Sequence, residues 1–101
     1  MRIERYKVAV VQAAPPYPPS KKDSVEEICQ IAKEAGSKGA RIVVFPETFI
    51  PAYPNWAIEA KPPVAWNTKW LKIAKESIEI PGPETGQLSK AAKSAGSMIC
   101  A

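Results

Sequence analysis

The sequence has 101 residues, 46% of them hydrophobic and 24% charged, which is within the range of soluble globular proteins and permits one small domain. Its net charge is +4, but the 14 lysines and arginines are interspersed with 10 acidic residues and no DNA- or RNA-binding signature is present, so no nucleic-acid partner is expected. The absence of histidine excludes Ser–His and Cys–His catalytic pairs and histidine-ligated metal sites.

The sequence contains neither a signal peptide nor a transmembrane segment, because residues 1–6 are polar and every apolar run is short. A cytoplasmic location without a membrane partner is therefore expected. Cys29 and Cys100 lack the CxxC spacing, which favours reduced thiols over a disulfide.

A buried strand is predicted over residues 6–13 (YKVAVVQA), a β-branched apolar run that stops at the prolines of residues 15–19. An amphipathic helix is predicted next, with Asp23 and Ser24 as its N-cap residues and Glu27 completing a capping box. Gly36 or Gly39 can end this helix. Its apolar residues recur at helical spacing: Val25, Ile28, Cys29, Ala32 and Ala35.

A second strand is predicted over residues 41–45 (RIVVF), so that strand, helix and strand fit within about 40 residues. This is the length of a βαβ unit, in which the strands are parallel and the crossover is right-handed. Glu47 follows two residues past the second strand. A carboxylate outside the carboxyl end of a strand lies where open α/β sheets generally bind their ligands, so the position of Glu47 suggests a site.

Residues 48–63 are rich in proline and aromatic side chains and are expected to form an ordered loop. Helical spacing returns in the apolar residues that follow, which are Trp66, Trp70, Ile73, Ala74 and Ile78. A further helix is predicted from Thr85, as its cap, to Gly96 in the C-cap position, and residues 97–101 form the beginning of another strand. The predicted fold class is therefore α/β: a βαβ unit followed by a loop, two helices and a truncated strand.

The segment VVFPETFIPAYP, residues 43–54, resembles the N-terminal signature of the nitrilase superfamily of carbon–nitrogen hydrolases, and its nitrilase branch in particular. The resemblance extends to KVAVVQAAP, AGSKGARIVVFPE and IPGPETGQLSKAAKSAG, and so covers nearly the whole chain. It implies that residues 1–101 are the N-terminal portion of a single, longer hydrolase domain with an α-β-β-α sandwich fold. Residues 1–101 would then be incomplete as a domain.

The resemblance implies a Glu–Lys–Cys catalytic set, of which Glu47 is the glutamate. Glu47 would be the general base that takes the proton of a cysteine thiol, so that the thiolate attacks a nitrile carbon. No residue of this chain matches the lysine or the nucleophile of the family. Cys29 lies on the apolar stripe of a helix and Cys100 in the truncated strand, and both are interpreted as structural. The isolated chain is therefore expected to be inactive, and neither a metal nor an organic cofactor is implied.

The surroundings of Glu47 admit two interpretations. Phe45, Phe49 and Tyr53 could build an apolar pocket suited to a general base, or Glu47 could cap a turn or pair with a surface lysine. By resemblance Tyr53 lines the substrate pocket, the alternative being that it packs beneath the loop. Ala52 replaces the glycine of the usual PGYP, which matters if the backbone there requires a positive φ.

The apolar, aromatic loop FIPAYP favours a small uncharged nitrile as the substrate. Two alternatives remain: an amidase or carbamoylase of the same superfamily, and a non-catalytic, stand-alone interaction module. The resemblance also implies that the full-length parent is a homo-oligomer that acts in nitrogen compound metabolism.

Overall fold

The computed structural model describes residues 4–54 and 63–101. Within this part, the elements follow the order β1 (Lys7–Val10), α1 (Lys21–Ser37), β2 (Ala40–Val44), α3 (Pro63–Lys75), α4 (Pro83–Ala95) and β3 (Met98–Cys100). The predicted α/β class and order of elements are confirmed. The predicted loop is confirmed for residues 48–54, and its residues 55–62 lie outside the described part.

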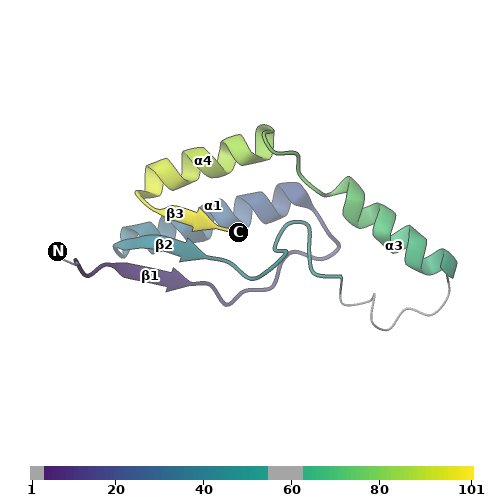
Figure 1. Ribbon diagram of the computed structural model, residues 1–101, viewed down its shortest axis with the longest axis horizontal. Helices are drawn as coiled ribbons and strands as arrows, with labels where there is room; N and C mark the ends of the chain where they lie inside the picture. Colours follow the sequence, from purple (N-terminus) through teal and green to yellow (C-terminus); the bar gives the residue numbers. More distant parts are fainter. Residues whose placement is uncertain (1–3, 55–62) are drawn as a thin grey trace.

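The three strands form one parallel sheet in the order β1-β2-β3 (Figure 1). Ala9, Val43 and Ile99 are aligned across it and all pack into the core, so this row faces the helices. The pairing of β1 with β2 shifts between Lys7 and Val8, where β2 contains one residue more. The parallel βαβ unit and the short last strand are thus both confirmed.

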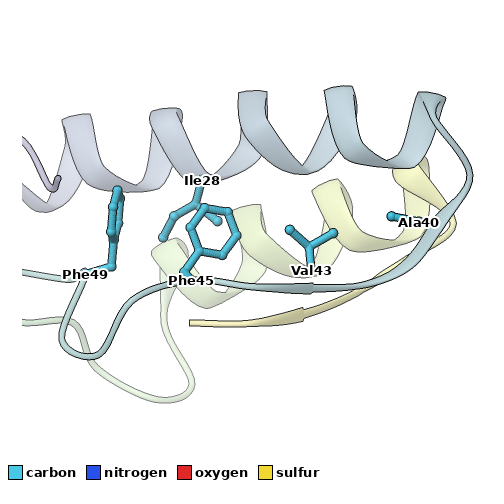
Figure 2. Packing of buried hydrophobic residues seen from close by; sticks show 5 residues of the cluster. All are labelled: Ile28, Ala40, Val43, Phe45 and Phe49. Atoms are coloured by element: carbon cyan, nitrogen blue, oxygen red, sulfur yellow. The ribbon is translucent and has the colours of Figure 1, made fainter. Parts of the chain in front are cut away.

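Helices α1 and α4 cover one face of this sheet (Figure 1). Helix α1 packs on β2 and on α4, and α4 packs on β3. Between the helices and the sheet lies the hydrophobic core, and Figure 2 shows how its side chains converge. The buried members of this core are Ile28, Ala40, Val43, Phe45 and Phe49.

The other face of the sheet, here called the open face, is uncovered in the described part of the chain. Because side chains alternate along a strand, it carries the neighbours of the core row: Val8, Val10, Ile42, Val44, Met98 and Cys100. Val10 is 80% and Met98 62% exposed. The prediction that the first strand is buried is therefore wrong for β1, which lies at the sheet edge. A sheet that is apolar on both faces suits one layer of an α-β-β-α sandwich.

The N-terminus of α1 differs from the prediction. Ser20 is the N-cap, and its hydroxyl oxygen accepts a hydrogen bond from the backbone N–H of Asp23 at 3.2 Å. Ser24, predicted as a cap, is completely buried on the inward face of the helix. Several polar residues near residue 20 have the spacing of an N-cap. Ser24 cannot be the cap because its side chain points into the core.

Polar contacts connect the start of α1 to the residue that follows α3 and to the first turn of α4. A carboxylate oxygen of Glu76 accepts a hydrogen bond from the backbone N–H of Lys21 at 2.9 Å. The ammonium group of Lys21 lies 3.7 Å from a carboxylate oxygen of Glu84. A negative charge at a helix N-terminus is favourable because of the helix dipole, so Glu76 helps to fix the end of α3 to α1.

The ends of α3 and α4 also require corrections. Helix α3 ends at Lys75, so Ile78 lies beyond it. Helix α4 begins at Pro83 with Gly82 as the N-cap, and Thr85 lies one turn inside, where its hydroxyl oxygen accepts the Gly82 N–H at 2.9 Å. Gly96 is the predicted C-cap and has the left-handed conformation, with φ 67°.

Helices α1 and α4 approach closely at Gly36, which lies inside α1 instead of ending it. The helix ends at the C-cap Lys38, and Gly39 follows with φ 89°. A Cβ atom at Gly36 would lie 2.5 Å from the carbonyl oxygen of Ala95. Only a residue without a side chain therefore fits at this helix–helix contact.

We expect Gly36→Ala to lower the free energy of unfolding by about 1–3 kcal/mol, because overpacking outweighs the gain in helix propensity. Gly86→Ala in α4 is the matched control, since a Cβ there meets no atom within 4 Å. The control should stabilise the chain by about 0.5–1 kcal/mol. Urea denaturation of the two variants checks this prediction, and equal shifts in the same direction would contradict it.

Candidate functional site

Glu47 lies in a turn that follows the central strand of the three-stranded sheet. β2 ends at Val44, and the backbone N–H of Phe45 still donates a hydrogen bond to the carbonyl oxygen of Cys100 at 2.8 Å. All three strands are parallel, so their carboxyl ends meet at this edge. Glu47 therefore lies outside the carboxyl ends of the strands, three residues past β2 rather than two.

The side chain of Glu47 is exposed, and it has no hydrogen bond or ion pair among the described residues. The alternatives in which it caps a turn or pairs with a surface lysine are not observed in this part of the chain. An exposed carboxylate without an internal partner keeps its acceptor oxygens available to a ligand or to another polypeptide segment.

Phe45 and Phe49 do not surround Glu47, as one of the two interpretations of the sequence required. Their exposed fractions are 6% and 0%, and both rings lie in the core beside Ile28 (Figure 2). The ring centroids are 5.5 Å apart at an interplanar angle of 60°, a tilted arrangement that aromatic pairs favour. The two phenylalanines thus fix both ends of the turn that carries Glu47.

The residue after Glu47 has an unusual backbone conformation. Thr48 has φ 53° and is the one non-glycine residue with positive φ in the described ranges. For a β-branched residue this is a true outlier. No sequence signal points to it, since turns that require positive φ normally carry glycine or asparagine.

Tyr53 is half exposed and Ala52 is buried. The tyrosine ring is therefore neither packed fully beneath the loop nor part of the core, and much of its surface remains available for contact. Ala52 has an ordinary negative φ, so the replacement of the family's glycine causes no conformational difficulty here.

Neither cysteine has the surroundings of an activated nucleophile. Cys29 lies in α1, with its sulfur 3.9 Å from the carbonyl oxygen of Gln87 in α4. Burial and the nearby carboxylate of Glu26 raise the pKa of the Cys29 thiol, which disfavours the thiolate. Cys100 lies exposed on the open face, at the end of β3.

The described residues contain no group of three or more Cys, Asp or Glu side chains that could hold a metal ion. Their helices include none with both the length and the apolar character needed to span a bilayer.

An apolar groove of about 460 Å³ lies between β1 and α1, with Val11, Ile31 and Ala35 among its lining residues. None of its lining residues belongs to the Glu47 turn. Because β1 has no second neighbouring strand in the described part, the groove follows an unpaired sheet edge. It is therefore separate from the candidate site.

Comparison with known proteins gives a match along almost the entire chain. A family model described as carbon–nitrogen hydrolase matches residues 7–101. The chain is 34% identical over 87 residues to a nitrilase of Paraburkholderia phymatum, covering 86% of this chain and 25% of that protein. It is 37% identical over 97 residues to an aliphatic nitrilase of Sinorhizobium fredii, covering 91% and 31%.

A third relative is an arylacetonitrilase of Hypocrea virens, 34% identical over 90 residues, with 89% of this chain and 26% of that protein covered. The chain thus spans between a quarter and a third of the length of these three relatives.

Proposed function

This chain belongs to the carbon–nitrogen hydrolase family, and on that basis we propose that it supplies the general base, Glu47, of a nitrilase that converts small nitriles to carboxylic acids and ammonia. The observation that carries the proposal is the position of Glu47. It follows the central strand at the carboxyl edge of the sheet, exposed and without a partner among the described residues.

In the proposed reaction, Glu47 accepts a single proton. Its carboxylate accepts the proton of a cysteine thiol, and the resulting thiolate forms a C–S bond with the nitrile carbon while the nitrogen is protonated, which gives a thioimidate. Addition of water and loss of ammonia leave a thioester. A second water releases the carboxylic acid and restores the thiol. The cysteine, and a lysine that stabilises the tetrahedral intermediates, come from polypeptide outside residues 1–101.

A nitrile is the preferred substrate for two reasons. Three relatives similar to this chain are nitrilases by name, one of them an aliphatic nitrilase and another an arylacetonitrilase. The loop after Glu47 is apolar, and the half-exposed ring of Tyr53 offers surface to an uncharged ligand. We assign Tyr53 to the substrate pocket on this basis. An amidase or carbamoylase would act through the same glutamate on a more polar group.

A stand-alone interaction module is less favoured than an enzyme segment. The open face exposes Val8 and Val10 on β1 and Met98 on β3, and Ile42 and Val44 of β2 lie between them on the same face. A contiguous apolar surface of this kind tends to associate in solution unless another layer covers it. The family resemblance also supports a cytoplasmic, homo-oligomeric parent enzyme that uses no cofactor.

The proposal is tested by measuring ammonia release by the hydrolase that carries this chain, from phenylacetonitrile and from phenylacetamide under identical conditions. We expect a higher kcat/KM for the nitrile. Turnover of the amide without turnover of the nitrile would refute the nitrilase assignment in favour of an amidase.

The same assay tests Tyr53. Tyr53→Ala should raise KM for the nitrile, because it removes the ring that contacts the substrate. Tyr53→Phe keeps the ring and is the matched control. An unchanged KM in Tyr53→Ala would remove Tyr53 from the substrate pocket.

A further inference from the structure

The turn that carries Glu47 is fixed at both ends and short. Phe45 and Phe49 are buried in the core, with their ring centroids 5.5 Å apart (Figure 2). Three residues separate them, and the first of these, Pro46, has a φ that its ring holds near −65°. The rotation that returns the chain to the core therefore falls on Glu47 and Thr48.

The backbone of Thr48 turns the chain back toward the core by adopting the left-handed conformation, with φ 53°. A β-branched side chain makes this conformation unfavourable, and such a conformation persists only where the surrounding structure requires it. The two buried rings impose this conformation on Thr48. A negative φ at Thr48 would either draw Phe49 out of the core or redirect Glu47.

We propose that Thr48 is a positioning residue for Glu47, and that its left-handed backbone conformation directs the carboxylate outward from the sheet edge. This inference rests on the proposed function of Glu47. The hydroxyl of Thr48 is not needed, since the side chain is exposed and has no hydrogen bond among the described residues. Thr48 therefore acts through its backbone.

Substitutions of Thr48 can separate a role of its backbone conformation from a role of its side chain. Thr48→Asn and Thr48→Gly introduce residues that adopt positive φ readily, and Thr48→Val keeps the side-chain shape without the hydroxyl. In the hydrolase that carries this chain, all three should retain kcat/KM within about 3-fold. Thr48→Pro holds φ negative and should lower kcat at least about 100-fold with little change in KM, because the base is displaced.

A double variant separates positioning from a general structural role. If Thr48 acts through Glu47, Thr48→Pro should cause no further loss of kcat in a Glu47→Gln background. Additive losses would overturn the inference, as would a loss in Thr48→Val or Thr48→Gly equal to that in Thr48→Pro. Full activity of Glu47→Gln would instead refute the proposed function itself.

Stability measurements test the conformation even if Thr48→Pro does not fold. Thr48→Gly should maintain or raise the urea midpoint, because glycine relieves the positive-φ strain. Gln12→Gly, at an exposed loop residue with negative φ, should lower it. Equal decreases for both glycine variants would show that Thr48 is not held in the left-handed conformation and would overturn the inference.

Discussion

Glu47→Gln is expected to lower kcat of the hydrolase that carries this chain by about 10²- to 10⁴-fold, the range over which general-base catalysis contributes. Glutamine keeps the size of the side chain but cannot accept the thiol proton. The stability should change by no more than about 0.5 kcal/mol, because Glu47 is exposed and has no partner among the described residues. Steady-state kinetics on a nitrile together with urea denaturation check both expectations.

Glu79→Gln is the matched control for this prediction, since Glu79 is also exposed but lies in the connection between α3 and α4. It should leave kcat unchanged.

The isolated 101-residue chain should release no ammonia from a nitrile, because it contains a base without its nucleophile and the raised pKa of Cys29 disfavours that thiolate. This prediction would be contradicted if the isolated chain released ammonia and Glu47→Gln abolished that release.

Phe49→Ala is expected to lower the free energy of unfolding by about 3–5 kcal/mol, the cost of removing a large aromatic side chain from a core. Phe49 is fully buried and contacts the ring of Phe45. Since a small domain has a total stability of about 5–15 kcal/mol, this variant can leave little folded protein. Phe49→Leu, with an expected loss of about 1–1.5 kcal/mol, gives a measurable intermediate case.

Tyr53→Ala is the control, because it removes an aromatic ring from the same loop at a half-exposed position. It should cost less than about 1 kcal/mol. Urea denaturation followed by circular dichroism measures all three variants. Similar losses in Phe49→Ala and Tyr53→Ala would show that Phe49 does not anchor the turn.

Much of the fold could be predicted because its signals are local. The β-branched runs at residues 6–13 and 41–45 and the helical spacing between them predicted the parallel βαβ unit, and the short run at residues 97–101 predicted β3. Helix ends were less predictable. Ser20 and Ser24 are chemically equivalent as caps, and only the direction of each side chain relative to the core distinguishes them.

The candidate site shows the same division. The position of Glu47 after a strand was readable from the sequence, because it depends on residue order alone. The direction of the neighbouring rings was not, since the same FPETF segment is compatible with phenylalanines around the carboxylate or beneath it. Packing against Ile28 in α1 decided this, and both rings lie in the core.

By itself, then, the sequence determined the order of strands and helices, the parallel βαβ connection and the single carboxylate placed after β2, because these follow from periodicity and chain order. Only the tertiary structure decided that β1 lies at an edge, that Gly36 accommodates Ala95, and that Thr48 takes a left-handed conformation. The physical reason is that these features depend on contacts between residues distant in the chain, and such contacts override the local preferences of the residues involved.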